Sequence, residues 1–188
     1  MSDYRRAFVP GGSFFLTIVT AGRAPLFEGL AAVRLLGQCI RAEMAANPFT
    51  VDACVLLPDH WHILMSLPSG DSGYSRRIGR IKSAFTRQWR AAGGSERSVS
   101  DSQRRRHEAG VWQPRFWEHT CESECDFETH FDYVHVNPLK HRFVKRVRDW
   151  PHSTFHRWVA AGVYGPDWGT DERESDRIVR LEQSAGEP

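Results

Sequence analysis

Cysteine is scarce in this chain, and its placement excludes a disulfide-stapled fold. Four cysteines occur among 188 residues, and their spacing shows no paired framework. Cys39 and Cys54 stand within apolar runs, which predicts that both are small core residues. Cys121 and Cys125 have C-x3-C spacing, a weak motif for zinc. The chain must therefore depend on a hydrophobic core, for which its length is sufficient.

Long hydrophobic runs are also missing. No apolar stretch approaches the ~20 residues that span a bilayer, and Tyr4-Arg5-Arg6 is not followed by the apolar segment of a signal peptide. We therefore expect a cytoplasmic protein that does not enter a membrane. A hydrophobic share of 40% and seven tryptophans indicate one folded domain. We place this domain at residues 1–168 and expect the charged tail at 169–188 to be partly disordered.

Hydrophobic periodicity predicts a chain of mixed strands and helices. β-Branched and aromatic residues in runs of strand length indicate strands, and apolar residues three or four positions apart indicate helices. Gly11-Gly12 precedes the first strand, and Asn47-Pro48 ends the first helix. The predicted strands are 13–20, 49–57, 60–67 and 111–117, and the predicted helices are 31–46, 74–92 and 124–137.

The order of these elements, β-α-β-β-α followed by a fourth strand, is that of a ferredoxin-like fold. We therefore predict an α+β protein with an antiparallel sheet packed against helices. The fourth strand contains Pro114, which fits a sheet edge better than a centre. Residues 94–110 combine glycines, serines and Arg104-Arg105-Arg106, and we expect a mobile surface loop there. Residues 142–168 look irregular.

The sequence Pro-Asp-His-Trp-His at 58–62, where the third strand begins, is the most informative stretch. Successive side chains of a strand point to opposite faces, so His60 and His62 share one face at a separation of about 7 Å. Two imidazoles on a rigid element are suitable metal ligands. The pair alone fits equally well with two half-exposed histidines that bind nothing. We interpret His135 and His141 as hydrogen-bonded surface residues rather than as a catalytic base.

The last predicted helix offers a phenol and an amide. Tyr133 and Asn137 lie four positions apart and share a helix face, and Pro138 is expected to end the helix after Asn137. Two imidazoles and an amide oxygen leave positions open for phosphate oxygens, which suits Mg²⁺ or Mn²⁺. A metal there would polarise a phosphodiester while the phenol attacks phosphorus. Taken alone, a tyrosine in this run is more often a core residue.

Positive charge is concentrated on the second predicted helix, although the net charge of the chain is only +2. Residues 74–92 contain no acid, and residues 140–148 are again basic. Such a stripe is usually a solvated face, but beside a phosphate-cutting site it favours contact with a nucleic-acid backbone. Trp112, Phe116 and Trp117 could stack on unpaired bases, although core packing is the better interpretation for at least two of them.

Six blocks of sequence together carry a resemblance to one protein family. They are Tyr-Arg-Arg at 4–6, Leu-Pro-Asp-His-Trp-His at 57–62, Ile-Lys-Ser at 81–83, Trp-Gln-Pro-Arg-Phe-Trp-Glu-His at 112–119, Asp-Tyr-Val-His-Val-Asn-Pro-Leu-Lys-His at 132–141 and Asp-Trp-Pro-His-Ser-Thr-Phe at 149–155. In this order they resemble the REP-associated tyrosine transposases, which are relatives of the single-tyrosine insertion-sequence transposases in the HUH endonuclease superfamily.

The resemblance implies a ferredoxin-like, HUH endonuclease-type domain that cleaves and rejoins hairpin-bearing single-stranded DNA through a 5′-phosphotyrosine. By this likeness Tyr133 is the nucleophile. His60, His62 and Asn137 hold Mg²⁺ or Mn²⁺, and the insertion-sequence relatives usually have glutamine at the Asn137 position. We expect a monomer or homodimer associated with the nucleoid. The DNA-binding residues that we predict are Arg5, Arg6, Arg76, Arg77, Arg80, Lys82, Arg87, Arg90, Arg115 and Lys140.

Two other functions fit parts of the sequence. A module that binds a nucleic-acid hairpin without cleaving it would keep the same fold, although the presence of His60, His62 and Tyr133 argues against it. A zinc hydrolase would use the two histidines, a third ligand and a water nucleophile. It lacks an evident third histidine or carboxylate at helical spacing and gives the basic helix no role. Metal content separates the hydrolase from the other two functions.

Overall fold

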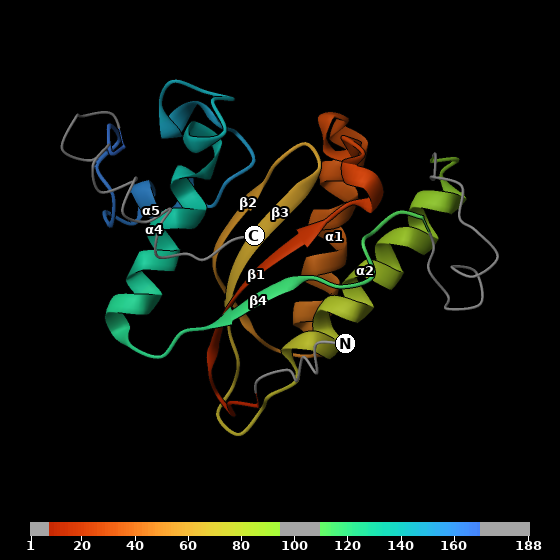
Figure 1. Ribbon diagram of the computed structural model, residues 1–188, viewed down its shortest axis with the longest axis horizontal. Coiled ribbons are helices and arrows are strands. Elements are labelled where there is room, and N and C mark those ends of the chain that lie inside the picture. Colours follow the sequence, from red (N-terminus) through yellow and green to blue (C-terminus); the bar gives the residue numbers. More distant parts are fainter. Residues whose placement is uncertain (1–7, 95–109, 170–188) are drawn as a thin grey trace.

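The computed structural model describes residues 8–94 and 110–169. Four strands form one antiparallel sheet in the order β2-β3-β1-β4, with helices on both faces (Figure 1). In chain order the elements are β1 (Ser13–Val19), η1 (Ala21–Arg23), η2 (Leu26–Glu28), α1 (Leu30–Ala46), β2 (Thr50–Leu56), β3 (His60–Ser66), α2 (Tyr74–Ala91), β4 (Trp117–Thr120), α4 (Glu124–Lys140), η3 (Val147–Asp149) and α5 (Phe155–Ala160). This topology confirms the predicted ferredoxin-like α+β fold.

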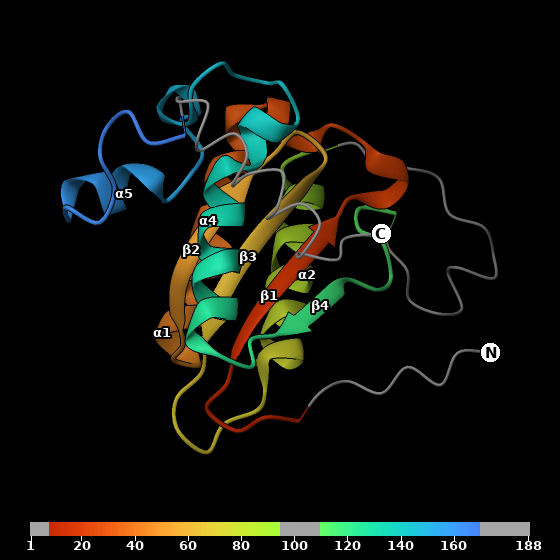
Figure 2. The same cartoon turned by 60° about the vertical axis from the view of Figure 1, so that its left-hand side comes forward.

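Alternating side chains along the strands give the sheet two different faces. From β3, Trp61 and Ile63 belong to the core cluster that includes residues of α1 and α2, whereas Leu64 belongs to a cluster with α4 and α5. Figure 2 shows α4 in front of the sheet and α1 and α2 behind it. Because His60 and His62 alternate with Trp61 and Ile63, they lie on the α4 face.

The central strands fix where the two histidines lie. β3 begins at His60, directly after the Pro58-Asp59 turn from β2. β1 pairs with both β3 and β4, so Thr17 lies opposite His62 on one side and opposite Trp117 on the other. β3 is itself paired with β1 on one side and with β2 on the other. The histidines therefore stand on an internal strand, where the ladders on both sides hold the backbone in place.

The fourth strand differs from its predicted range of 111–117. The paired strand is Trp117–Thr120, whereas Trp112 makes an isolated bridge to the residue after β1. The physical reason is Pro114, which lacks the N–H group that a continuous ladder needs. Regular pairing therefore starts after the proline and places His119 on the strand.

The prediction that Pro138 ends the last long helix is wrong by about one turn. α4 continues to Lys140, because the carbonyls of Asn137 and Pro138 accept hydrogen bonds of 3.0 Å from His141 and Phe143. These bonds complete the last turn although the proline supplies no N–H. The extension keeps Lys140 on the same helix as the tyrosine.

The remaining predictions concern the core cysteines and the segments outside the sheet. Cys39 and Cys54 pack in the larger core cluster, as expected. Residues 142–168 contain η3 and α5 and are more regular than predicted. The predicted loop at 94–110 and the tail at 169–188 lie almost wholly outside the described residues. No helix in the described part of the chain is long and apolar enough to cross a membrane.

Candidate active site

Two histidines with fixed ring orientations form the centre of the site. The ring centroids of His60 and His62 are 4.9 Å apart. Nδ1 of His60 lies 2.5 Å from Oδ1 of Asp59, and Nδ1 of His62 lies 2.9 Å from Oγ1 of Thr17. In metal sites, a contact of this kind at one ring nitrogen orients the other nitrogen toward the ion. The arrangement therefore suits metal ligation through Nε2 of both rings.

Asp59 connects the histidines to the turn that follows β1. Its carboxylate accepts a hydrogen bond of 3.1 Å from Nη1 of Arg23. Burial by itself would raise the pKa of Asp59, but the contacts with His60 and Arg23 prevail and hold that pKa below its ordinary value. Asp59 is therefore ionised at neutral pH and accepts the Nδ1–H of His60.

Helix α4 places Tyr133 over the histidine face of the sheet. The side chain is fully buried, and its ring centroid lies 5.9 Å from that of His62 with the rings edge to face. Nζ of Lys140 donates a hydrogen bond of 2.6 Å to the phenolic oxygen and lies 4.7 Å from the ring centroid. An ammonium group in this position stabilises negative charge that develops on the oxygen.

Asn137 lies one turn after Tyr133 and is fully buried. Within the described residues, neither Oδ1 nor Nδ2 of its side chain has a hydrogen-bond partner. An unsatisfied buried amide costs on the order of 1–3 kcal/mol, so its presence needs an explanation. A metal bound through Oδ1 would satisfy the oxygen. Together with two imidazoles, this amide is a donor set that fits Mg²⁺ or Mn²⁺.

A pocket of about 300 Å³ opens beside His60. Its lining residues are Thr17, Val19, Arg23, His60, Gln113, Arg115, Phe116, Trp117, Lys140 and His141. Arg115 and Lys140 bring positive charge to this pocket, which suits an anionic group such as a phosphate. His141 is exposed as predicted, and its ring centroid lies 5.4 Å from that of His60.

The basic helix α2 covers the face of the sheet opposite the histidines (Figure 2). Arg77 is buried there, and its guanidinium donates to the carbonyls of Asn47 and Pro48 and pairs with Asp71 at 2.6 Å. These bonds fasten the start of α2 to the loop before β2. Arg77 is therefore engaged in the fold and is the weakest member of the predicted DNA-binding set.

The other basic side chains of α2 differ in their contacts. Arg80 pairs with Glu43 of α1 at 2.6 Å, whereas Lys82 donates a hydrogen bond of 2.8 Å to the carbonyl of Gln113, which lines the pocket. Lys82 thus connects the α2 side to the pocket around the β4 edge. The remaining predicted DNA-binding residues are Arg76, Arg87 and Arg90, exposed on α2, and Arg5 and Arg6, outside the described residues.

His135 is fully buried, which corrects its interpretation as a surface residue. Nδ1 lies 3.2 Å from the hydroxyl of Tyr164, and Nε2 lies 2.9 Å from Oγ1 of Thr154. Burial lowers the pKa of His135 to about 3, so the ring is uncharged at neutral pH. Both partners lie far along the chain, and for this reason local sequence gave no sign of the burial.

Core packing accounts for two of the three aromatic residues that were candidates for base stacking. Trp112 and Phe116 are buried in the cluster with α1 and α2. Trp117 is partly buried on the other face and contributes to the pocket. Core packing of at least two of these residues is therefore confirmed.

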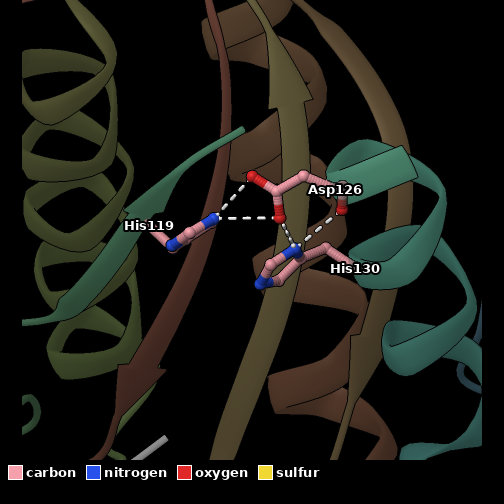
Figure 3. Close-up of side chains that lie close together, drawn as sticks. All are labelled: His119, Asp126 and His130. Carbon is pink, nitrogen blue, oxygen red and sulfur yellow. Dashed lines mark hydrogen bonds and ion pairs between the residues drawn. The ribbon is translucent and has the colours of Figure 1, made fainter. Parts of the chain in front are cut away.

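A second group of titratable side chains lies on the α4 face, and the sequence did not reveal it (Figure 3). His119 on β4 and Asp126 and His130 on α4 each offer a ligand atom, and these atoms lie within 4.8 Å of one another. Cys121 and Cys125 belong to no such group in the part of the chain that the structure describes. The i,i+4 spacing of Asp126 and His130 was a local signal, but contact with His119 requires the tertiary fold.

The carboxylate of Asp126 holds this group together. Nε2 of His119 lies 3.0 and 2.8 Å from its two oxygens, and Nδ1 of His130 lies 2.9 Å from Oδ1. Burial alone would raise the pKa of Asp126, but the Glu122 N–H and His119 hold it below its ordinary value. Burial also lowers the pKa of His130. At neutral pH the group therefore contains an ionised carboxylate and an uncharged His130.

Comparison with known proteins gives several close relatives. The chain is 40% identical to a REP-associated tyrosine transposase of Haemophilus influenzae, over 90% of this chain and 94% of the relative. It is 37% identical to the REP-associated tyrosine transposase of Escherichia coli, over 95% of this chain and 99% of the relative. A solved REP-associated tyrosine transposase bound to a REP hairpin superposes with a TM-score of 0.76 at 38% identity, covering 91% and 93% of the two chains. No family model matches.

With these relatives, the fold and the histidine–tyrosine face define the class of protein. It is a tyrosine transposase, an enzyme that cleaves and rejoins DNA. The similarity extends over nine-tenths or more of the chain and of each relative. The chain belongs to the family of REP-associated tyrosine transposases.

Proposed function

We propose that the chain is a metal-dependent endonuclease and strand transferase of the HUH type, which acts on single-stranded DNA with Tyr133 as nucleophile. One observation carries the proposal. The phenolic oxygen of Tyr133 accepts a 2.6 Å hydrogen bond from Nζ of Lys140, while the phenol ring faces His62 edge-on. A nucleophile, a charge that activates it and a pair of metal ligands thus occur together on one face of the sheet.

In the proposed cleavage step, the oxygen of Tyr133 loses its proton to solvent water and attacks the phosphorus of a phosphodiester. A bond forms between this oxygen and phosphorus, the bond from phosphorus to the 3′ oxygen breaks, and the 3′ oxygen takes up a proton from solvent water. The products are a 5′-phosphotyrosine and a free 3′-hydroxyl. Attack by a 3′-hydroxyl on the phosphotyrosine reverses the step and joins strands. Lys140 stabilises the negative charge on the phenolic oxygen when it attacks and when it leaves.

His60, His62 and Asn137 are the residues that would hold Mg²⁺ or Mn²⁺. The fit rests on the buried amide of Asn137, which has no hydrogen-bond partner among the described residues, and on the contacts of the two Nδ1 atoms with Asp59 and Thr17. When bound, such an ion supplies Lewis-acid polarisation of a phosphate oxygen. Asp59 and Thr17 keep the imidazole rings in position.

The proposed substrate is single-stranded DNA that carries a REP-like hairpin. Support comes from the solved relative bound to a REP hairpin and from Arg115 and Lys140 in the pocket beside His60. The exposed arginines of α2 would contact stem phosphates, which position a duplex without reading its sequence. We further propose that the enzyme acts in the cytoplasm at the nucleoid, as a monomer or homodimer.

The decisive experiment uses labelled single-stranded DNA from around the gene of this protein, with and without its hairpin. We expect a covalent protein–DNA band on a denaturing gel in the presence of Mn²⁺, and no band with excess chelator or with Tyr133→Phe. A hairpin-specific gel shift without any covalent band would favour the binding module instead. Cleavage that persists in Tyr133→Phe and requires zinc would favour the hydrolase.

A further inference from the structure

We propose that His119, Asp126 and His130 form a second divalent-metal site, of the kind that binds Zn²⁺ (Figure 3). Two imidazole nitrogens and a carboxylate are a donor set that zinc takes in proteins, with water in a fourth position. This set contains no amide, in contrast to the set around His60 and His62. By ligand chemistry it favours Zn²⁺ over Mg²⁺.

The spacing of the three ligand atoms suits a small tetrahedral ion. Bonds of 2.0–2.2 Å to zinc place neighbouring ligand atoms about 3.4 Å apart. Asp126 lies 2.8 Å from Nε2 of His119 and 2.9 Å from Nδ1 of His130, and all three ligand atoms lie within 4.8 Å of one another. The carboxylate therefore needs to move away from each ring nitrogen by about half an ångström. Nδ1 of His130 also lies 2.9 Å from the backbone carbonyl of Asp126, and the ion would replace this contact. The backbone N–H of Glu122 donates to Oδ2 of Asp126 at 2.9 Å, and such outer contacts orient metal-binding carboxylates.

The exposure of the three side chains provides a route for the ion. His130 is 1% exposed, whereas His119 and Asp126 are 33% and 22% exposed. The group is therefore closed on the His130 side and reachable from solvent on the His119 side. A zinc site of this kind needs both an entry path and room for a water ligand.

The ring of Phe15 lies between this group and the proposed catalytic residues. Its centroid is 4.9 Å from that of His130, 5.5 Å from that of His62 and 5.6 Å from that of Tyr133. A metal bound to His119, Asp126 and His130 would join β4 to the first turns of α4, one turn before the tyrosine. The ion would then stabilise the fold and hold the nucleophile-bearing helix against the sheet.

The test measures metal binding by the full chain after treatment with chelator and dialysis, with Co²⁺ as the spectroscopic probe and Zn²⁺ as competitor. For the wild type we expect two bound equivalents of Zn²⁺. The double variant His60→Ala/His62→Ala should retain one, with visible Co²⁺ absorption that Zn²⁺ removes. Adding Asp126→Asn, which keeps the side-chain volume, should weaken this binding by at least about 10- to 100-fold. His156→Gln, a change at an exposed histidine, should leave it unchanged.

The outcomes separate this site from the catalytic one. A folded double variant that binds no Co²⁺ would overturn the proposal and leave the three residues as a hydrogen-bonded group. Binding that survives Asp126→Asn would do the same, because the ion would then lie elsewhere. If the aspartate variant does not fold, His119→Gln at the more exposed ligand takes its place. If the double variant does not fold, a wild-type stoichiometry of one rejects the site and a stoichiometry of two supports it.

Discussion

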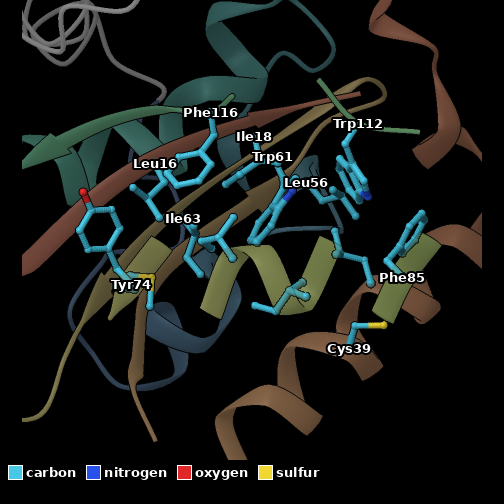
Figure 4. Packing of buried hydrophobic residues seen from close by; sticks show 14 of the residues in the cluster. Leu16, Ile18, Cys39, Leu56, Trp61, Ile63, Tyr74, Phe85, Trp112 and Phe116 are labelled. Atoms are coloured by element: carbon cyan, nitrogen blue, oxygen red, sulfur yellow. The ribbon is translucent and has the colours of Figure 1, made fainter. Parts of the chain in front are cut away.

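The two faces of the β-sheet are built from different kinds of buried residue. The face toward α1 and α2 buries large apolar side chains, including Leu16, Ile18, Trp61, Ile63 and Phe85 (Figure 4). The face toward α4 also buries polar ones. These are His60, His62, His130, Asp132, His135 and Asn137, whereas the buried polar side chains on the other side of the sheet, Glu43, Arg77 and Thr86, belong to α1 and α2 and not to the strands. Burying polar groups is costly unless they find partners, so the α4 face is the less favourable one for stability alone.

One strand serves both faces because its side chains alternate. Trp61 and Ile63 of β3 fill the apolar core, while His60 and His62, one position before each of them, reach the site. The apolar pair keeps the backbone of β3 fixed, and the histidines are thereby held in a constant relation to α4. Under the proposed function, stability comes mainly from one face and chemistry from the other, and we expect substitutions at neighbouring positions of β3 to separate the two.

The largest expected contrast lies between Trp61→Ala and His62→Ala. The first opens a cavity in the apolar core and should lower the free energy of unfolding by about 3–5 kcal/mol. The second should abolish DNA cleavage with a smaller loss of stability, about 1–3 kcal/mol. Urea unfolding and the covalent-adduct gel measure the two effects. If His62→Ala cleaves DNA normally, the assignment of the site to the α4 face is wrong.

Two tyrosines of the α4 face provide the next contrast. Tyr133→Phe should eliminate the covalent adduct and change stability by no more than about 1 kcal/mol, because it loses one hydrogen bond from Lys140. Tyr164→Phe likewise removes only the phenolic oxygen, here from a buried tyrosine whose hydroxyl donates to Asp132 at 2.6 Å. It should keep the adduct but lose about 1–3 kcal/mol of stability. An adduct formed by the Tyr133→Phe protein would reject Tyr133 as nucleophile.

Sequence predicted the element order and the shared face of the two β3 histidines, because both follow from local patterns. The alternation in β3 placed His60 and His62 on one face of the strand, and helical periodicity placed Tyr133 and Asn137 on one face of the helix that covers them. The bounds of β4 were missed, since pairing across the sheet decides where a strand starts. The placement of α2 opposite the site, away from the histidines, was likewise fixed by tertiary packing.

The buried histidines show the same limit. His135 gains its partners from Thr154 and Tyr164, which lie 19 and 29 residues later in the chain. His119 meets His130 only because β4 lies beside α4, with ring centroids 4.3 Å apart. Neither contact has a short-range signature, so a reading by periodicity alone assigns such residues to the surface.

Asn137→Leu tests whether the buried amide belongs to the site or to the core. Leucine has a similar volume and no polar atoms, so removing an unsatisfied amide should leave stability equal or raise it by up to about 1–3 kcal/mol. Adduct formation at limiting Mn²⁺ should fall, by about 10- to 100-fold, if the amide oxygen is a ligand. The measurement is a Mn²⁺ titration of adduct yield. Unchanged Mn²⁺ dependence would remove Asn137 from the ligand set.

The buried His135 makes the stability of the α4 face sensitive to pH. Burial lowers its pKa in the folded state from 6.5 to about 3, so the unfolded chain binds more protons between these values. Stability from this residue is therefore full above pH 6.5 and declines as the pH falls toward 3, by at most roughly 1.4 kcal/mol per unit. His135→Gln should flatten urea-unfolding stability between pH 6.5 and 4.5. His156→Gln, at an exposed position, should keep the wild-type slope.

The smallest effects concern which face of the molecule holds DNA. Arg115 is exposed at the pocket beside His60, and Arg87 is exposed on α2 behind the sheet. If each contacts a phosphate, Arg115→Gln and Arg87→Gln should each reduce the log–log salt slope of hairpin binding by about 0.7 to 0.9. Exposed Arg34 on α1 serves as the control, and all three variants should stay within about 0.5 kcal/mol of wild-type stability.

The pattern of these slopes distinguishes two paths for the DNA. A reduced slope for both Arg115 and Arg87 means that the hairpin passes around the β4 edge, where Lys82 already reaches the carbonyl of Gln113 beside the pocket. A reduced slope for Arg115 alone confines the DNA to the α4 face, and the acid-free stripe of α2 is then a solvated surface. Because phosphate contacts do not read sequence, hairpins of different sequence should respond alike to Arg87→Gln. A sequence-dependent response would instead place Arg87 at a base edge.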